Sequence, residues 1–129
     1  MTTAASNRGT IVVLNRDLMF GARITSHLRP IGYTIVFARD TTRFVELMRS
    51  THPRPVLGIL DMNGTIAWDM IDSLAHDPTV TIPLLGFGPH TDVDGRRAAK
   101  AADVTRIVSN SEFHGALVSL VERYATPPP

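Results

Sequence analysis

The sequence predicts a three-layer α/β/α sandwich built around a five-stranded parallel sheet. Five short apolar runs have the length and β-branched composition of strands, and segments with helical spacing of apolar residues separate them. Several runs are apolar at successive positions, which indicates burial on both faces, as in a parallel sheet covered by helices. Because crossovers between parallel strands are right-handed, five such units in 129 residues favour an open sandwich over an eight-unit barrel.

The predicted strands are short, and turn residues precede several of them. They are IVVL (11–14), TIVFA (34–38), VLGIL (56–60), IPLLGF (82–87) and TRIV (105–108). Gly32 lies where the first helical segment should give way to the second strand. Pro53 and Pro55 bracket the entry to the third strand, and Pro78 and Pro83 flank the entry to the fourth.

Apolar residues at helical spacing predict a helix after each strand. The first three stripes are Phe20, Ile24 and Leu28; Phe44, Leu47 and Met48; and Trp68, Ile71 and Leu74. The fourth segment, from Asp92 to Ala102, is rich in alanine, so we expect it to make the smallest contact with the core. The last segment has a wide stripe and predicts one helix that Asn110 or Ser111 caps. This stripe consists of Phe113, Leu117, Leu120, Val121 and Tyr124.

The length and composition predict one domain, because 129 residues with 43% hydrophobic content support one packed core. We expect this domain over residues 10–125, a disordered segment at 1–9 and a tail at 126–129. No run approaches the roughly 18 apolar residues that a membrane span needs, and no leader pattern begins the chain. We therefore expect a cytoplasmic protein that does not bind membranes.

The charge and the missing motifs favour a binding protein over an enzyme. With 13 basic and 12 acidic residues, the net charge of +1 gives no strong basic field, so we expect no nucleic-acid partner. The chain has no cysteine, which excludes disulfides and thiolate chemistry. Phosphate-binding loops, dinucleotide-binding fingerprints, nucleophile elbows and HExxH zinc motifs are all absent from the sequence.

The candidate site lies just after the strands, because ligands of open parallel sheets bind outside the carboxyl ends of the strands. Small or polar residues follow four of the predicted strands. They are Asn15, Arg16 and Asp17 after the first; Asp61, Asn63 and Gly64 after the third; Gly86, Gly88 and His90 around the end of the fourth; and Ser109, Asn110 and Ser111 after the fifth.

In the order and spacing of these elements, residues 10–125 resemble the receiver domain of two-component response regulators, of which the bacterial chemotaxis regulator is a single-domain example. The resemblance implies a flavodoxin-like sheet with strand order 2-1-3-4-5 and a role in two-component signal transduction or a phosphorelay. Family members place an acidic pair after the first strand, a phosphoacceptor aspartate after the third, a hydroxyl after the fourth and a lysine-proline pair after the fifth.

Only the aspartate of this set is kept, so the chain resembles a degenerate receiver, or pseudo-receiver. The resemblance places Asp61 at the phosphoacceptor position and Gly88 at the hydroxyl position. Asn15 and Arg16 take the places of the acidic pair, and Ser109 with Asn110 takes those of the lysine and proline.

The substitutions predict a pocket that binds no metal and no other cofactor. Magnesium prefers an oxygen-rich shell built on carboxylates, and Asn15 and Arg16 supply none. Asp17 could offer one carboxylate, but aspartate is strongly preferred at helix starts, so we interpret it as a cap. Arg16 has two interpretations that the sequence leaves open. Its guanidinium either lies beside Asp61 in place of the metal or is solvated at the surface.

Histidines offer little further chemistry. The loop with Gly86, Gly88 and His90 could bind a small anion, but a tight, capped turn is the favoured interpretation. The remaining histidines show no metal-ligand spacing, and we expect them at the surface. They are His27, His52, His76 and His114.

We expect function through protein contacts. In receivers the fourth helix, fifth strand and fifth helix form the usual face for dimers and partners, and basic residues populate that region here: Arg96, Arg97, Lys100, Arg106 and Arg123. The leading hypothesis is a stand-alone receiver-like protein that contacts a histidine kinase or another signalling protein, or a second copy, without ordinary magnesium-dependent phosphorylation. The first alternative is an atypical receiver that is phosphorylated on Asp61 and binds Mg²⁺, and the second is a small-anion sensor that uses the 86–92 loop.

Overall fold

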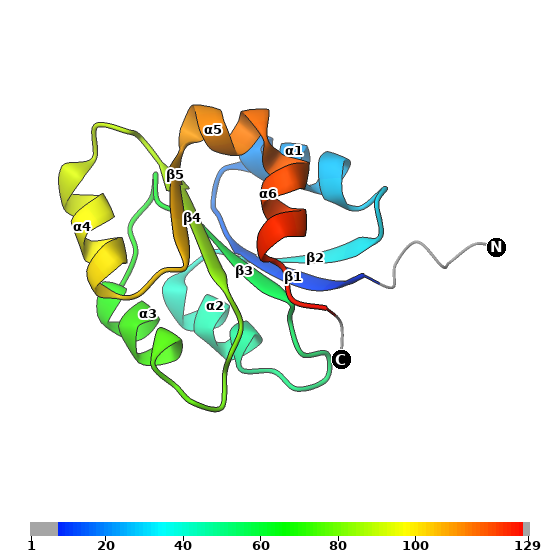
Figure 1. Ribbon diagram of the computed structural model, residues 1–129, viewed down its shortest axis with the longest axis horizontal. Helices are drawn as coiled ribbons and strands as arrows, with labels where there is room; N and C mark the ends of the chain where they lie inside the picture. The colour runs from blue at the N-terminus through cyan, green and yellow to red at the C-terminus, as the bar shows by residue number, and fades with distance from the viewer. Residues whose placement is uncertain (1–7, 128–129) are drawn as a thin grey trace.

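The computed structural model describes residues 8–127 and confirms the predicted sandwich and strand order. All strand pairs are parallel, and the sheet runs β2-β1-β3-β4-β5 (Figure 1). The strands are β1 (Gly9–Leu14), β2 (Tyr33–Ala38), β3 (Leu57–Asp61), β4 (Leu84–Gly88) and β5 (Arg106–Ser109). The helices are α1 (Leu18–Leu28), α2 (Thr41–Met48), α3 (Trp68–Ala75), α4 (Val93–Ala101), α5 (Asn110–Gly115) and α6 (Leu117–Tyr124).

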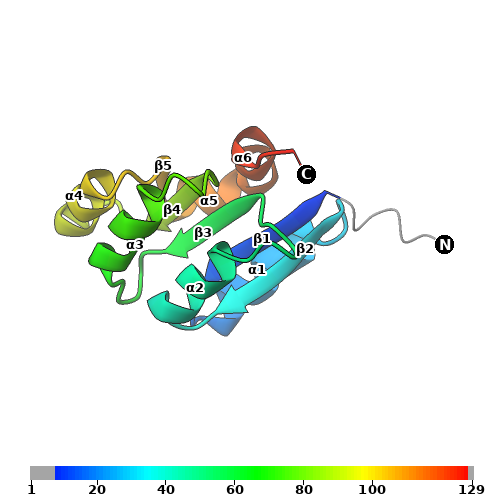
Figure 2. The same ribbon diagram turned by 90° about the horizontal axis from the view of Figure 1, so that it is seen from below.

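Helices cover both faces of the sheet, as the continuous apolar strands predict (Figure 2). Successive side chains of β1 point to opposite faces: Ile11 and Val13 join the core beneath α1, α5 and α6, whereas Val12 and Leu14 join the core beneath α2, α3 and α4. The strands β1 and β3 lie inside the sheet, and every residue of β3 is buried. The sheet therefore carries Asp61, the last residue of β3, on a rigid central strand.

An aromatic cluster fills the core under α1 and α5. The rings of Phe87 and Phe113 stack with their centroids 3.9 Å apart and an interplanar angle of 6°. Phe20 meets the edge of Phe87 at 6.0 Å, so side chains from α1, β4 and α5 pack against one another. This cluster lies directly behind the carboxyl edge of the sheet, because β4 ends one residue after Phe87.

Aspartates start three of the helices. Asp17, Asp40 and Asp92 each accept a hydrogen bond from a main-chain N–H in the first turn of α1, α2 and α4. The predicted turn at Gly32, between the first helix and the second strand, is confirmed. This residue has φ of 109°, a value that a residue with a Cβ rarely adopts. The aspartate caps thus begin the helices that follow β1, β2 and β4 at the carboxyl edge of the sheet, and of these caps the sequence analysis predicts Asp17.

The predicted final helix is wrong in one respect, because it is broken into α5 and α6. Ala116, with φ of −134° and ψ of 29°, leaves the helical conformation between them. The preceding Gly115 costs about 1 kcal/mol relative to alanine in a helix interior, which weakens the helix at this point. The predicted caps are also corrected, since Ser109 accepts the hydrogen bond from the Glu112 N–H at 3.1 Å.

The predicted strand bounds differ from the observed ones by at most two residues. The most consequential difference is at β3, which includes Asp61 rather than ending before it. The predicted disordered segment at 1–9 falls mostly on residues 1–7, outside the described residues, whereas Gly9 begins β1. At the predicted tail, the Thr126 N–H donates to the Val56 carbonyl at 2.9 Å. Within residues 8–127, no helix has the length and apolar character to cross a membrane.

Candidate functional site

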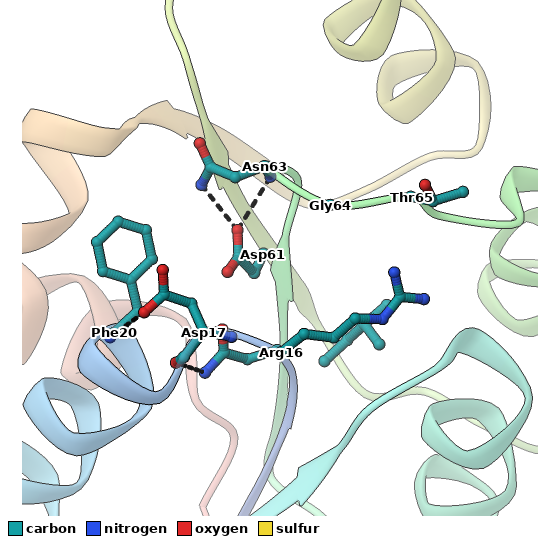
Figure 3. Close-up of a pocket in the computed structure, with 9 residues that line it drawn as sticks. Arg16, Asp17, Phe20, Asp61, Asn63, Gly64 and Thr65 are labelled. Atoms are coloured by element: carbon teal, nitrogen blue, oxygen red, sulfur yellow. Dashed lines mark hydrogen bonds between the residues drawn. The ribbon is translucent and has the colours of Figure 1, made fainter.

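A cavity of about 290 Å³ lies beside Asp61 at the carboxyl edge of the sheet (Figure 3). It opens between β1 and β3, where the strand order reverses and where open α/β sheets bind ligands. Its lining comes from the ends of β1 and β3, the start of α1 and the loop after β3. The lining residues are Leu14, Asn15, Arg16, Asp17, Phe20, Asp61, Asn63, Gly64 and Thr65.

Asp61 presents one oxygen to its own loop and the other to the cavity. Its Oδ1 accepts hydrogen bonds from the main-chain N–H of Asn63 at 2.9 Å and from Asn63 Nδ2 at 2.7 Å. Only 7% of Asp61 is exposed, and its Oδ2 makes no hydrogen bond within residues 8–127. The carboxylate is therefore held in place while one oxygen remains open to a ligand.

Asn63 also forms a reciprocal pair with Asn110, which we call the amide pair. Asn63 Nδ2 donates to Asn110 Oδ1, and Asn110 Nδ2 donates to Asn63 Oδ1, both at 2.9 Å. The pair ties the loop after β3 to the first residue of α5. Sequence reasoning placed Asn63 in the pocket but missed the role of Asn110, because no spacing signal joins residues 47 positions apart.

The acidic-pair position is occupied by a side chain that folds back on its own loop. Asn15 Oδ1 accepts from the Asp17 N–H at 2.9 Å, and Asn15 Nδ2 donates to the Asp17 carbonyl at 2.8 Å. Asp17 Oδ1 accepts from the N–H groups of Met19 at 2.8 Å and Phe20 at 3.1 Å. The structure thus confirms that Asp17 caps α1, and this carboxylate oxygen is committed to the helix.

Arg16 lines the cavity but extends away from Asp61. Its Nε donates to the Arg39 carbonyl, just after the end of β2, and Figure 3 shows the guanidinium on the far side from the Asp61 carboxylate. None of the ion pairs in the described part of the chain joins these two residues. The sequence leaves two interpretations of Arg16 open. The structure contradicts the one in which its guanidinium lies beside Asp61 in place of a metal.

The hydroxyl and lysine positions carry no group that reaches the cavity. Gly88 ends β4, and a Cβ there would lie 3.0 Å from Met62 Cβ, so even a small side chain would displace Met62. Gly86 is equally covered, since a Cβ would meet Met62 Sδ at 2.9 Å. The Ser109 hydroxyl caps α5, and His90 is exposed. Neither glycine of the 86–92 loop lines the cavity beside Asp61.

The prediction that His114 is a surface residue is wrong. Its ring packs against Phe20 with centroids 4.6 Å apart and against the edges of Phe87 and Phe113. Both ring nitrogens are buried without a hydrogen-bond partner. Burial lowers the pKa of His114, the positive charge of Arg23 lowers it further, and Asp61 acts in the opposite direction. A neutral imidazole therefore belongs to the aromatic cluster behind the cavity.

This burial predicts acid sensitivity. Because the pKa of His114 is lower in the folded protein than its ordinary value of 6.5, the unfolded chain binds more protons as the pH falls. The contribution of neutral His114 to stability should be complete above pH 6.5, its ordinary pKa, and should diminish as the pH falls below 6.5. Urea unfolding from about pH 8 to about pH 5 should show the wild type losing stability relative to His114→Phe.

The comparison with the variant isolates His114 from the other histidines. A hydrogen bond to the Asp72 carbonyl, followed in importance by one to the Asp103 carboxylate, raises the pKa of exposed His76. The contribution of His76 to stability is therefore present below its ordinary pKa and is lost as the pH rises. This effect is the same in the wild type and in His114→Phe. An unfolding free-energy difference between wild type and variant that stays constant with pH would contradict the assignment.

Within residues 8–127, no three or more His, Asp or Glu side chains are grouped so as to hold a metal ion. Asp61 and the capping Asp17 are the carboxylates that line the cavity. Since magnesium sites are built on carboxylates and keep near-ideal octahedral geometry, this donor set does not fit the ion well.

No family model and no curated protein matches the chain. Solved structures do match it. The phosphorylated cyanobacterial phytochrome response regulator RcpA is 18% identical with a TM-score of 0.77, over 95% of this chain and 99% of that one. The manganese-bound response regulator Rcp1 is 17% identical with a TM-score of 0.72, over 94% and 99% of the two chains. The chemotaxis protein CheY4 of Vibrio cholerae is 14% identical with a TM-score of 0.74, over 90% and 98%.

These similarities span nearly the whole chain at low sequence identity, and they agree with the observed strand order and helix placement. The chain therefore has the fold of response-regulator receiver domains.

Proposed function

We propose that the protein is a receiver-like signalling protein that acts through protein contacts and does not use ordinary magnesium-dependent phosphorylation. The observation that carries this proposal is the donor set around Asp61. Asn15 and Asp17 bond to the start of α1, and Arg16 turns toward Arg39. Phosphoryl transfer relies on a divalent cation and fixed positive charge around the transferred group, and none of these three side chains is arranged to supply them.

The fold itself is compatible with metal binding and phosphorylation, since the related Rcp1 structure contains manganese and that of RcpA is phosphorylated. Function is decided by the side chains that a fold carries at its site. In this chain, the positions expected to grip a phosphoryl group are Gly88, which has no side chain, and Ser109, whose hydroxyl caps α5. The amide pair already holds α5 to the loop after β3.

A groove between α4 and β5 supports a role in protein contacts. Its volume is about 540 Å³, and Val93 on its rim is 60% exposed. Its cationic lining residues are Arg96, Arg97, Lys100 and Arg106. Arg106 is paired with Glu112 at 3.2 Å, and the remaining cations give the groove a positive character. We propose that this face meets an acidic signalling partner, such as a histidine kinase, or a second copy of the chain.

The alternative, phosphorylation on Asp61 in a phosphorelay, is favoured by one observation. Asp61 Oδ2 faces the cavity and makes no hydrogen bond within the described residues, so it is available as a phosphoryl acceptor. Asp17 lines the same cavity. In this alternative, Asp17 and a main-chain carbonyl would hold the magnesium ion beside Asp61.

Incubation with Mg²⁺ and acetyl phosphate separates the two proposals. The leading proposal predicts little acyl phosphate on the wild type by intact-protein mass spectrometry, at a level that Asp61→Asn does not change. An ordinary chemotaxis receiver treated in parallel controls for the donor. Rapid phosphorylation of the wild type that Asp61→Asn abolishes would overturn the leading proposal and support the alternative.

A further inference from the structure

We propose that Asn63 is a site of spontaneous deamidation, that the amide pair with Asn110 restrains the reaction, and that the product weakens the link between the loop after β3 and α5. Asn63 is the one asparagine of the sequence that glycine follows. Both Asn63 and Gly64 are exposed. The proposal does not depend on whether Asp61 is phosphorylated.

The reaction needs only water. The Gly64 main-chain nitrogen loses its proton and attacks the side-chain carbonyl carbon of Asn63, forming a cyclic imide. The bond from that carbon to Nδ2 breaks, and ammonia leaves with the proton. Water then opens the imide and gives aspartate or isoaspartate. A following side chain slows this ring closure by crowding the nitrogen, and glycine has none.

The surroundings of Gly64 leave space for the ring to form. A Cβ built on Gly64 would meet a single neighbour within 4 Å, Arg16 Nη1 at 3.9 Å. No hydrogen bond engages the Gly64 N–H within the described residues. The nearby guanidinium also favours the negative charge that develops during the attack. These features identify Gly64 as an accessible nucleophile rather than a protected amide.

The restraint comes from the Asn63 side chain. Its Nδ2 donates to both Asp61 Oδ1 and Asn110 Oδ1, and its Oδ1 accepts from Asn110 Nδ2. To react, the side-chain amide must rotate toward Gly64 and give up these bonds. The loop must therefore open before the imide forms. Asn110 slows the reaction because it holds the Asn63 side chain in the unreactive position.

Conversion to aspartate reverses the polarity of the contact. Where Nδ2 now donates at 2.7 Å to Asp61 Oδ1 and at 2.9 Å to Asn110 Oδ1, a carboxylate oxygen would face two acceptors. Two carboxylates at such a distance repel each other, and the Asn110 carbonyl loses its donor. Deamidation would thus remove one of the two bonds of the amide pair and add negative charge to the cavity, while Asn110 Nδ2 could still donate to a carboxylate oxygen at position 63.

The test measures conversion by peptide mass spectrometry, with fragmentation that distinguishes aspartate from isoaspartate, in the 129-residue chain held at mildly alkaline pH. Native wild type should convert at residue 63, and Asn110→Ala should convert about 5- to 30-fold faster, as expected when two ordinary hydrogen bonds are lost. Asn110→Ser serves as a second variant, and circular dichroism checks that both are folded. Wild type in urea gives the unrestrained rate.

Gly64→Ala is the matched control, because a Cβ fits at this position without a close contact. It should slow conversion in both the wild-type and the Asn110→Ala background. Equal rates in native wild type and folded Asn110 variants would overturn the restraint. If Asn63 is not converted in any of these proteins, or if Gly64→Ala leaves the conversion rate unchanged, Asn63 is not the proposed deamidation site.

Discussion

Replacing Phe87 with alanine should lower the free energy of unfolding by about 3–5 kcal/mol. Phe87 has no exposed surface, and its ring stacks on Phe113 with centroids 3.9 Å apart. The substitution removes buried apolar surface and leaves a cavity that rigid β4 cannot close. Because single domains are stable by only about 5–15 kcal/mol, this change alone should remove a large fraction of the total stability.

Urea unfolding followed by far-ultraviolet circular dichroism measures this effect. Phe37→Ala provides the control, since Phe37 is 38% exposed on the edge strand β2 and should cost much less. A loss below about 1 kcal/mol for Phe87→Ala would mean that the aromatic cluster repacks without it, contrary to the close packing described above.

The double variant Asn15→Asp, Arg16→Asp should bind Mg²⁺ on the order of 100-fold more tightly than the wild type. It replaces a neutral and a positive side chain of the cavity lining by two carboxylates. Asn15 Nδ2 now donates to the Asp17 carbonyl, and a carboxylate at this position would be repelled from that carbonyl and directed to the cavity. The new carboxylates would join Asp61 as oxygen ligands.

Isothermal titration calorimetry with Mg²⁺ measures the gain. The variant Asn15→Ser, Arg16→Gln removes the same two side chains without adding carboxylates and should gain far less affinity than the double variant. If wild type and double variant bind equally well, the supply of carboxylates is not what limits metal binding in this cavity. Equally tight binding by both would also remove the main support for the proposed function.

The sequence predicts the fold well because the strands of a sheet covered on both faces form uninterrupted apolar runs. Runs such as VLGIL are apolar without interruption, and glycine, proline and aspartate mark the turns and helix starts between them. These are local signals, each contained within a few residues. The same local logic correctly assigned Asp17 to the start of α1.

The site is harder to predict because its side chains bond to residues that are distant in the sequence. The sequence leaves two directions open for Arg16, and the structure shows its side chain bonded to the carbonyl of Arg39, just after β2. Asn110 bonds to a residue of the loop after β3, and the His114 ring packs against phenylalanines from three elements. Such contacts depend on the packed fold and leave no periodic trace in the chain.

The two ends of the described chain have a practical consequence. Arg8 bonds to Gly32 beside the start of β2, and Thr126 bonds to Val56 just before β3, so both lie at the amino edge of the sheet, opposite Asp61. Attaching a fluorophore or a solid support at either end of this segment keeps the carboxyl edge facing solution. Immobilised protein is therefore suited to surface-based binding assays of that edge.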